Sequence, residues 1–220
     1  MKVQFQYDNS PYLEIREVSV RGSWDGKERE MEKEGDGFRC SMQLPPGKYW
    51  YKFRINGELE LNDPYNNLYE KGPDGEFQSV LLVNEQGERL YHDCQYKATL
   101  EDYILTDKMA GNIQKKTYFD TDSRRVMAGF SFSGITGLHV LTAAWCDMYG
   151  NVFQTSENAI CGEKGRETED ILWFWMDLED VEKAGKTGMW RLRLFADGEF
   201  LLEDMFTIGN SRTQGQSLLL

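Results

Sequence analysis

Histidine and cysteine are scarce in this chain of 220 residues, which holds two histidines and four cysteines. Catalysis by a Ser-His-Asp or Cys-His arrangement needs a histidine beside the nucleophile, so two histidines leave little room for it. The cysteines form no Cys-x-x-Cys pair, and their wide spacing predicts free thiols rather than disulfides. They are Cys40, Cys94, Cys146 and Cys161.

One short tract, from Tyr91 through His92 and Asp93 to Cys94, places three potential metal ligands in a row. Neighbouring side chains on a strand point to opposite faces, so these three cannot converge on one ion. The sequence therefore predicts no metal site here, and it indicates no cofactor elsewhere.

An excess of basic residues and long apolar runs are also missing. The chain has 25 lysines and arginines against 37 acidic residues, a formal net charge of −12. This charge repels polyanions, which argues against nucleic acid as a partner and against an anionic membrane surface. No window approaches the ~18 consecutive apolar residues of a spanning helix. Residues 1–8 contain no apolar signal-peptide core, so we expect a cytoplasmic location.

Motifs of catalysis are absent too. A glycosidase needs two carboxylates ~5 to 10 Å apart, and no recognisable motif frames such a pair here. The stretch Ser131–Gly137 lacks the lysine of a phosphate-binding loop and the Gly-x-Gly-x-x-Gly order. A catalytic barrel of ~250 residues does not fit into the chain. The sequence predicts a protein without enzymatic activity of its own.

What the sequence does contain is a series of short strands in a chain rich enough in apolar residues, 40%, to be globular. Residues 1–97 predict a first domain, with strands over 12–20, 38–44, 48–55 and 78–83 and a last hairpin over 84–96.

The strand over 48–55 has the clearest alternation of this domain. Tyr51, Phe53 and Ile55 fall on one face, and Trp50, Lys52 and Arg54 fall on the other. The dipeptide Asn56-Gly57 that follows is typical of a tight type I′ hairpin turn. A tryptophan between two cations on a solvent-facing side is the arrangement in the first domain that most calls for a function.

The strand pattern lapses over residues 98–125, where a connector is expected, with a short helix over Leu100–Leu105. Residues 126–210 again predict strands and form a second domain, and 211–220 form a loosely held tail. The closing hairpin over 188–208, with its Asp197-Gly198 turn, is the clearest pair in the chain.

Most tryptophans are expected in the cores. In the second domain this is expected of Trp145, Trp173, Trp175 and Trp190.

The first half resembles a known family on a series of short motifs in a fixed order. They are Gly22-Ser23-Trp24, Leu44-Pro45-Pro46-Gly47-Lys48-Tyr49, Tyr51-Lys52-Phe53, Asn56-Gly57 and Asp63-Pro64-Tyr65. The series, over roughly residues 10–85, resembles family 48 carbohydrate-binding modules. These are early-set immunoglobulin-like domains of glycogen-branching and debranching enzymes and of the beta subunit of AMP-activated protein kinase.

The resemblance implies an early-set sandwich that binds glycogen. Lys52 matches a sugar-contacting cation of the family, and Gln78 stands near a family amide. The sequence departs from the family at Lys27 and Leu59, which occupy places where the family carries tryptophans. The closing hairpin is similar to the last strands of bacterial immunoglobulin-like domains. The expected fold is therefore all-β, with two immunoglobulin-like (early-set) β-sandwiches in tandem.

Two functions remain open. In the first, the chain is a non-catalytic accessory protein that binds an α-glucan, either glycogen or a maltooligosaccharide, and the sugar stacks on an aromatic platform ringed by polar donors. The expected contacts are Trp50, Lys52, Arg54, Tyr65, Asn66 and Gln78. In the second, the chain is a protein-binding adaptor with a degenerate sugar site. In both, the second domain binds a protein partner that the sequence does not identify, or a second copy of the chain through its edge strands to form a homodimer.

Overall fold

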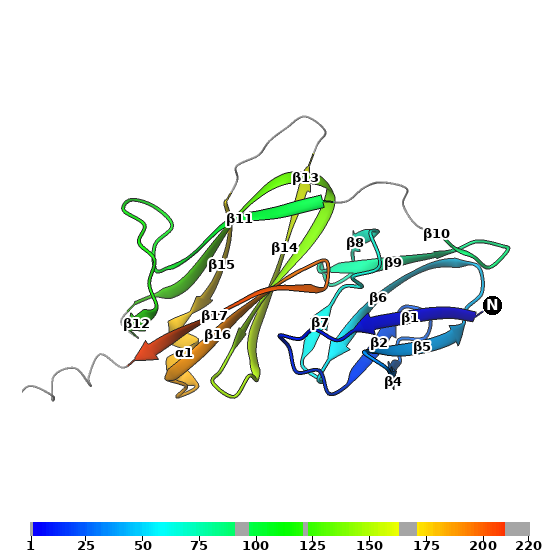
Figure 1. The fold of residues 1–220 in the computed structure, drawn as a ribbon, viewed down its shortest axis with the longest axis horizontal. Helices are drawn as coiled ribbons and strands as arrows, with labels where there is room; N and C mark the ends of the chain where they lie inside the picture. Colours follow the sequence, from blue (N-terminus) through cyan, green and yellow to red (C-terminus); the bar gives the residue numbers. More distant parts are fainter. Residues whose placement is uncertain (1, 91–96, 121–122, 163–170, 210–220) are drawn as a thin grey trace, which may run out of the picture.

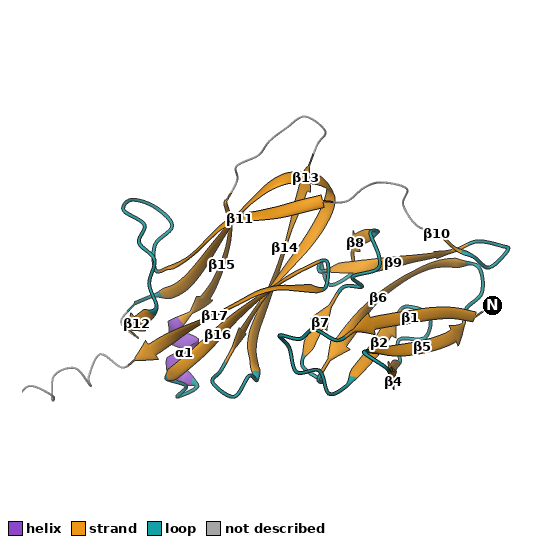
Figure 2. Cartoon of the chain, viewed as in Figure 1, coloured by secondary structure: helices purple, strands orange, loops and turns teal. Residues whose placement is uncertain are grey.

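A computed structural model gives the structure of the chain and describes residues 2–90, 97–120, 123–162 and 171–209. The described chain folds into two β-sandwiches that follow one another along the long axis of the molecule (Figure 1). Strands dominate, and the single helix of the described residues, α1 (Leu178–Lys183), lies at one end of the second sandwich (Figure 2). Among these residues, no helix has the length and apolar character needed to cross a membrane.

The first sandwich consists of two antiparallel sheets. The smaller sheet has the order β1-β5-β4, with strands β1 (Lys2–Asp8), β5 (Gly37–Gln43) and β4 (Glu32–Glu34). The larger sheet has the order β10-β9-β6-β2-β3, with strands β10 (Arg89–Leu90), β9 (Phe77–Val83), β6 (Gly47–Ile55), β2 (Val18–Gly22) and β3 (Glu28–Glu30). Two short strands join it: β7 (Leu59–Leu61) pairs with β6, and β8 (Tyr69–Lys71) pairs with β9.

Alternation along β6 sets the core of this sandwich. Tyr51, Phe53 and Ile55 are buried, as the period of two predicts. Asn56 and Gly57 both have positive φ, 51° and 72°, which is the backbone of the predicted type I′ turn between β6 and β7. Trp24 is half-buried and packs against the same core, with its ring centroid 5.4 Å from that of Phe5.

The second sandwich is organised around one long strand, β13 (Arg125–Cys146), which belongs to two sheets. Its first half pairs with β11 (Lys97–Thr106) and β15 (Ile171–Asp177). Its second half pairs with β14 (Val152–Gly162) and β16 (Gly188–Ala196), and β17 (Glu199–Gly209) and β12 (Tyr118–Asp120) extend that sheet. The change of sheet falls near Gly134 and Gly137, whose φ angles of 58° and 84° suit glycine.

The predicted connector with a helix over Leu100–Leu105 is wrong. That segment is part of β11, and Leu100, Tyr103 and Leu105 pair with Phe132, Phe130 and Ala128 on β13. The register shifts between Leu100 and Asp102, which is a β-bulge that breaks the alternation of apolar and polar side chains. Without that alternation, apolar residues three and four apart imitate a helical period.

The two sandwiches share apolar surface. Ala144 of β13 and Phe195 of β16 are fully buried in the core cluster of the first sandwich. Phe195 lies on the side of β16 opposite to Leu192 and Leu194, so its ring points away from the second core. The Tyr7 hydroxyl donates to the carbonyl oxygen of Gly198 at 2.9 Å, in a buried position. The contact between the sandwiches is therefore a packed interface, and residues 98–125 do not act as a free tether.

The tryptophans of the second sandwich divide into two pairs. Trp145 and Trp190 are fully buried, as predicted. The prediction is wrong for the other two, because β15 turns Phe174 and Met176 inward, which places Trp173 and Trp175 on the outer face. Trp175 is 42% exposed, and the guanidinium carbon of Arg125 lies 5.4 Å from its ring centroid.

Cys40, Cys146 and Cys161 are free thiols, in agreement with the sequence prediction. The fourth cysteine, Cys94, lies outside the described residues together with the rest of the 91–94 tract.

His139 is a buried histidine with an acidic partner at the closing hairpin. Its Nδ1 lies 2.6 Å from Asp197 Oδ2, and its Nε2 lies 3.1 Å from the Thr136 carbonyl oxygen. Two oxygen acceptors at the two ring nitrogens favour the doubly protonated ring. Burial alone would lower the pKa of His139, but the hydrogen bond and charge of Asp197 raise it above its ordinary value.

We expect His139 to make stability depend on pH. Because its pKa is higher in the folded than in the unfolded protein, its contribution is fully present below about pH 6.5, the unfolded value. The contribution is lost as the pH rises through the folded pKa. Urea unfolding gives the free energy of unfolding of the wild type and of His139→Gln from about pH 5.5 to about pH 9. The difference between the two values at each pH measures the contribution of His139. A difference that stays flat, or grows with pH, contradicts the prediction.

Candidate functional site

The side of β6 that faces away from the core carries the residues singled out by the sequence. Lys48, Trp50, Lys52 and Arg54 alternate along this strand with the buried Tyr51 and Phe53. Neighbouring strands add charged and amide side chains, namely Arg21 from β2, Glu28 from β3, Glu70 from β8 and Gln78 from β9. We refer to these eight outward residues as the β6 face.

Trp50 is half-buried in the middle of the β6 face. Its backbone N–H donates to Ser23 Oγ at 3.0 Å, and its indole Nε1 donates to Glu70 Oε2 at 3.3 Å. Lys48 Nζ lies 5.5 Å from the ring centroid and 2.5 Å from the Glu70 carboxylate. The hydrogen bond from Lys48 holds the pKa of Glu70 below its usual value. The indole is thus bordered by one cation and one carboxylate on long, exposed side chains.

Lys52 is covered by the second sandwich and is only 7% exposed. Its Nζ lies 2.6 Å from Glu157 Oε1 of β14 and 3.0 Å from Glu76 Oε2. Burial alone would lower the pKa of Lys52, but the charge and hydrogen bond of Glu157 raise it. Burial raises the pKa of Glu157, in spite of the lysine. A cavity of about 200 Å³ lies beside this pair, between the two sandwiches.

Arg54 and Gln78 remain at the surface of the β6 face. Arg54 Nη1 donates to Glu28 Oε2 at 3.2 Å, and Gln78 Nε2 donates to Asp74 Oδ2 at 3.3 Å. Both residues line a small depression of about 50 Å³ that also borders Lys52. Trp50, Arg54 and Gln78 are therefore accessible on the β6 face, while Lys52 lies beneath it.

The prediction that Asn66 contacts sugar is wrong for this structure, because the side chain is buried. Its Nδ2 donates to the Val80 carbonyl oxygen at 2.8 Å and to the Tyr51 hydroxyl oxygen at 3.1 Å, and its Oδ1 accepts the N–H of Leu68. All of these bonds tie the loop between β7 and β8 to the sheet. Amide residues in a loop next to aromatic ones are as typical of such internal anchors as of a binding surface.

Tyr65 lies elsewhere on the molecule. Its ring is 50% exposed, but its hydroxyl donates to Asp8 at the end of β1, in the opposite sheet of the sandwich. The Asp63-Pro64-Tyr65 turn carries it there, since Tyr65 N–H donates to Asp63 Oδ1 at 2.8 Å. Tyr65 and Trp50 therefore do not form one site.

Leu59 and Lys27, the two departures from the family pattern, have different settings. Leu59 is buried in the core of the first sandwich, on β7. Lys27 is exposed in the turn between β2 and β3, where its N–H donates to Asp25 Oδ1. Neither position offers an aromatic surface to a ligand.

Sequence reasoning missed the carboxylates around the two key side chains. Glu157 is 105 positions away from Lys52 along the chain, so its approach depends on how the two sandwiches pack. Glu70 borders Trp50 because β8 pairs with β9, which in turn pairs with β6. Of the charged residues beside Trp50, only Lys48 could be expected there from the sequence, because it lies two positions away on the same face of β6.

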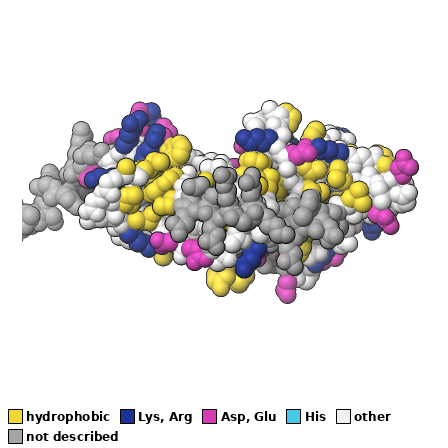
Figure 3. Space-filling model, turned by 90° about the horizontal axis from the view of Figure 1, so that it is seen from above, with side chains coloured by type: hydrophobic (Ala, Val, Ile, Leu, Met, Phe, Trp, Pro, Cys, Tyr) yellow, Lys and Arg dark blue, Asp and Glu magenta, His cyan; other side chains and the backbone are white. Residues whose placement is uncertain are grey.

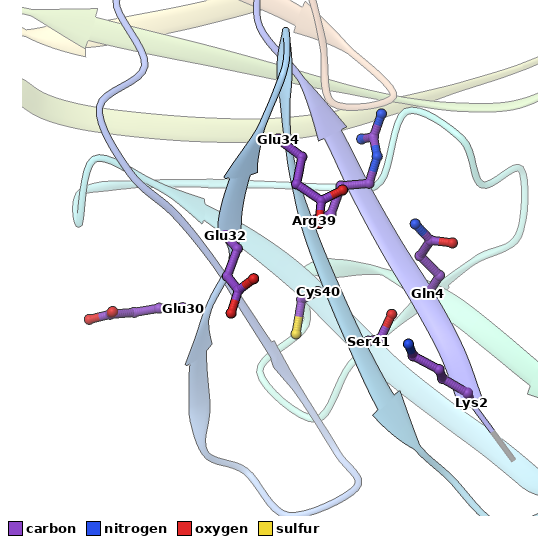
Figure 4. Close-up of a pocket in the computed structure, with 8 residues that line it drawn as sticks. All are labelled: Lys2, Gln4, Glu30, Glu32, Glu34, Arg39, Cys40 and Ser41. Carbon is purple, nitrogen blue, oxygen red and sulfur yellow. The ribbon is translucent and has the colours of Figure 1, made fainter.

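The largest of the described cavities lies on the outer side of the smaller sheet and measures about 480 Å³. Its side chains come from adjacent strands β1, β5 and β4, with Glu30 from the end of β3 (Figure 4). Three glutamates, Glu30, Glu32 and Glu34, line it together with Lys2 and Arg39. No cluster of three or more His, Cys, Asp or Glu residues within the described ranges is arranged to hold a metal ion.

Charges of both signs are interspersed with apolar side chains at both ends of the face shown in Figure 3. On that face the net negative charge is therefore not gathered into one field that would steer a large charged partner.

Comparison with known proteins gives a family for the first sandwich. Residues 3–89 match the family model described as the glycogen recognition site of AMP-activated protein kinase. The match confirms the family resemblance of the first half and, with the strand order, the predicted all-β sandwich class. It covers less than half of the chain. No curated protein matches the sequence.

Several solved structures share a distant likeness with the chain. An immunoglobulin-like protein from Pseudomonas aeruginosa has 19% identity over 52% of this chain and 98% of its own, with a TM-score of 0.31. A maltogenic amylase from S. marinus has 12% identity over 94% of this chain and 28% of its own, at 0.31. A DUF3823 family protein from Bacteroides ovatus has 7% identity over 94% of this chain and 99% of its own, at 0.31. These scores carry no argument about function.

Proposed function

We propose that the chain is a non-catalytic protein that binds an α-glucan, glycogen or a maltooligosaccharide, on the β6 face. The observation that carries the proposal is the accessible Trp50 in the middle of that face, within the segment that matches a glycogen-recognition family. Sugar rings have apolar faces that pack on aromatic rings, and their hydroxyls need donors and acceptors around the stack. Lys48 and Glu70 provide both beside the indole, and Arg54 and Gln78 add donors and an acceptor further along the same face.

The long side chains next to Trp50 make this binding surface adaptable. Lys48 and Glu70 are an exposed pair, and such pairs contribute only about 0 to 1 kcal/mol to stability. A sugar ring can therefore displace the ammonium from the indole at small cost, and Glu70 then accepts a sugar hydroxyl in place of Lys48.

Co-sedimentation with glycogen tests the proposal. We expect the wild type to sediment and Trp50→Ala to bind at least about tenfold more weakly, a loss of ~1.4 kcal/mol of binding free energy. Trp175→Ala is the matched control, since it removes an exposed tryptophan from the outer face of the second sandwich. The proposal is contradicted if the wild type stays in the supernatant, or if Trp50→Ala and Trp175→Ala sediment equally.

A protein-binding adaptor is the second candidate, and one observation favours it. The cation that matches the family's sugar contact, Lys52, is already engaged by Glu157 and Glu76. Under this alternative the β6 face is a remnant and the partner binds the second sandwich, where exposed Ile171 and Trp175 flank the half-buried Trp173 on the outer face of β15. The partner is another protein or a second copy of the chain, and glycogen sedimentation is then negative for all variants. A cytoplasmic location belongs to the glucan proposal, because glycogen is stored there.

A further inference from the structure

A second cavity with exposed aromatic walls lies between the two sandwiches, away from the β6 face. It measures about 340 Å³ and is lined by the end of β1 and the loop after it, by Pro64 and Tyr65, and by Gly198 with the first two residues of β17. Tyr12, Tyr65 and Phe200 supply its aromatic surface. We call it the interdomain cleft. Its volume falls at the lower end of the ~300 to 1,000 Å³ typical of small-ligand sites.

The walls of the interdomain cleft are held in place by contacts between the sandwiches. The Tyr7 hydroxyl donates to the Gly198 carbonyl oxygen at 2.9 Å. A Cβ atom at Gly198 would lie 1.9 Å from the Asn62 carbonyl oxygen, so the backbones approach as closely as glycine permits. The rings of Tyr12 and Phe200 stack with centroids 5.6 Å apart and planes 20° apart. The cleft is therefore formed before any ligand arrives, which limits the entropic cost of binding.

The two tyrosines are unusually open for large side chains in a concave site. Tyr12 is 73% exposed even though Phe200 covers one face of its ring, so the other face is free. Tyr65 is 50% exposed, and its hydroxyl is used by Asp8. Open aromatic faces in a cavity gain free energy when an apolar ring face covers them. No packing within the described chain accounts for the open ring of Tyr12.

The polar side chains of the interdomain cleft are two carboxylates, an amide and a hydroxyl, besides the tyrosine hydroxyls, and the charge of one carboxylate is partly balanced. Asp8 accepts from Gln6 Nε2 at 3.0 Å and lies 3.4 Å from Arg39 Nη1. Burial alone would raise the pKa of Asp8, but the Tyr65 hydroxyl, Gln6 and Arg39 together hold it below its usual value. Glu199 and Ser10 add a carboxylate and a hydroxyl. The described lining contains no lysine or arginine, which disfavours an anionic ligand.

We propose that the interdomain cleft binds a neutral saccharide of one or two rings, stacked on Tyr12 with its hydroxyls donating to Asp8 and Glu199. The combination of an open aromatic face, two carboxylates, of which Asp8 is partly balanced by Arg39, and no basic side chain in the lining fits a sugar and rejects phosphates and sulfates. This site is separate from the β6 face, and its test is independent of the test of the proposed function.

Backbone amide NMR titrations test the interdomain cleft directly. With maltose and cellobiose as probes, we expect the amides of Asn9, Tyr12, Tyr65 and Phe200 to shift on addition of at least one sugar. Tyr12→Ala should weaken these shifts at least about tenfold, ~1.4 kcal/mol. Tyr149→Ala is the control, because Tyr149 is an equally open tyrosine outside the cleft. The amides of Trp50 and Val80 report on the β6 face in the same spectra.

The two sites can fail separately. If Trp50→Ala abolishes the shifts at Trp50 and Val80 but leaves those of the interdomain cleft, the separate-site proposal is supported. The proposal is overturned if neither sugar shifts the cleft amides at concentrations up to about 50 mM, because the binding free energy would then be weaker than ~2 kcal/mol. It is also overturned if tetramethylammonium, a probe for cation binding to aromatic rings, shifts them and the sugars do not. Unchanged spectra of free Tyr12→Ala establish that the variant is folded.

Discussion

Replacing Phe195 with alanine is expected to lower the free energy of unfolding by about 3 to 5 kcal/mol. The phenyl ring is fully buried, yet it projects from β16 of the second sandwich into the core cluster of the first. Its ring also contacts that of Phe200 at 5.8 Å. Truncation opens a cavity at the interface between the sandwiches, and both sides of that interface lose apolar contacts.

The signature of this variant is the coupling between the two sandwiches. We expect calorimetry of the wild type to give one cooperative transition, and that of Phe195→Ala to give two, since the shared apolar surface is what joins their unfolding. Phe206→Ala is the control, because Phe206 is buried wholly within the second core. The control should lower the free energy of unfolding by a comparable amount, but it keeps the contacts between the sandwiches and so should not separate their unfolding. A cost below about 1 kcal/mol for Phe195→Ala would show that the interface contributes little.

Phe195 also illustrates why part of the fold is not visible in the sequence. By alternation, Trp190, Leu192 and Leu194 share one side of β16 and Phe195 lies on the other. The first sandwich covers that other side, which depends on how the two sandwiches pack and not on any local pattern. A bulge between Leu100 and Asp102 conceals β11. Alternation predicted β6 and the closing hairpin correctly, because their core residues recur at every second position, as Tyr51, Phe53 and Ile55 do.

The sequence predicts the parts of the candidate site that depend on local alternation, and not those that depend on packing between the sandwiches. The outward position of Trp50, Arg54 and Gln78 follows from local alternation and from the Asn56-Gly57 turn. The burial of Lys52 does not, since Glu157 reaches it from a strand whose position depends on the packing of two sandwiches. Trp173 and Trp175 were expected in the core because tryptophan is apolar, but which face of β15 is covered is decided by the sheet it joins.

Lys52 and Glu157 are the basis of the second large effect. Lys52→Met leaves Glu157 buried near Glu76 without its cation, and removing one partner of a buried pair costs about 3 to 5 kcal/mol. Glu157→Leu leaves Lys52 with Glu76 at 3.0 Å, so we expect a smaller cost of about 1 to 2 kcal/mol. The double variant Lys52→Met/Glu157→Leu should lie near the wild type, because it removes both desolvated charges.

Urea unfolding of the four proteins forms a double-mutant cycle. The predicted pattern is a large coupling energy, of about 2 kcal/mol or more, with the greater single cost at the lysine. Additive costs would mean that the ion pair contributes nothing beyond its separate side chains. A greater cost for Glu157→Leu would mean that Glu76 does not stabilise the lysine on its own.

The same variants connect the interface with the proposed function. Glu157, on the second sandwich, accepts a hydrogen bond from Lys52, the cation that the family resemblance assigns to sugar contact. If the β6 face binds glucan, Glu157→Leu leaves Lys52 held only by the exposed Glu76 carboxylate, which a sugar hydroxyl can replace. Binding to glycogen should then tighten by several-fold, about 1 kcal/mol. Lys52→Met should weaken it. In the adaptor alternative both variants stay in the supernatant when glycogen sediments, while the stability cycle is unchanged. Sedimentation and unfolding therefore separate the structural role of the pair from its role at the sugar surface.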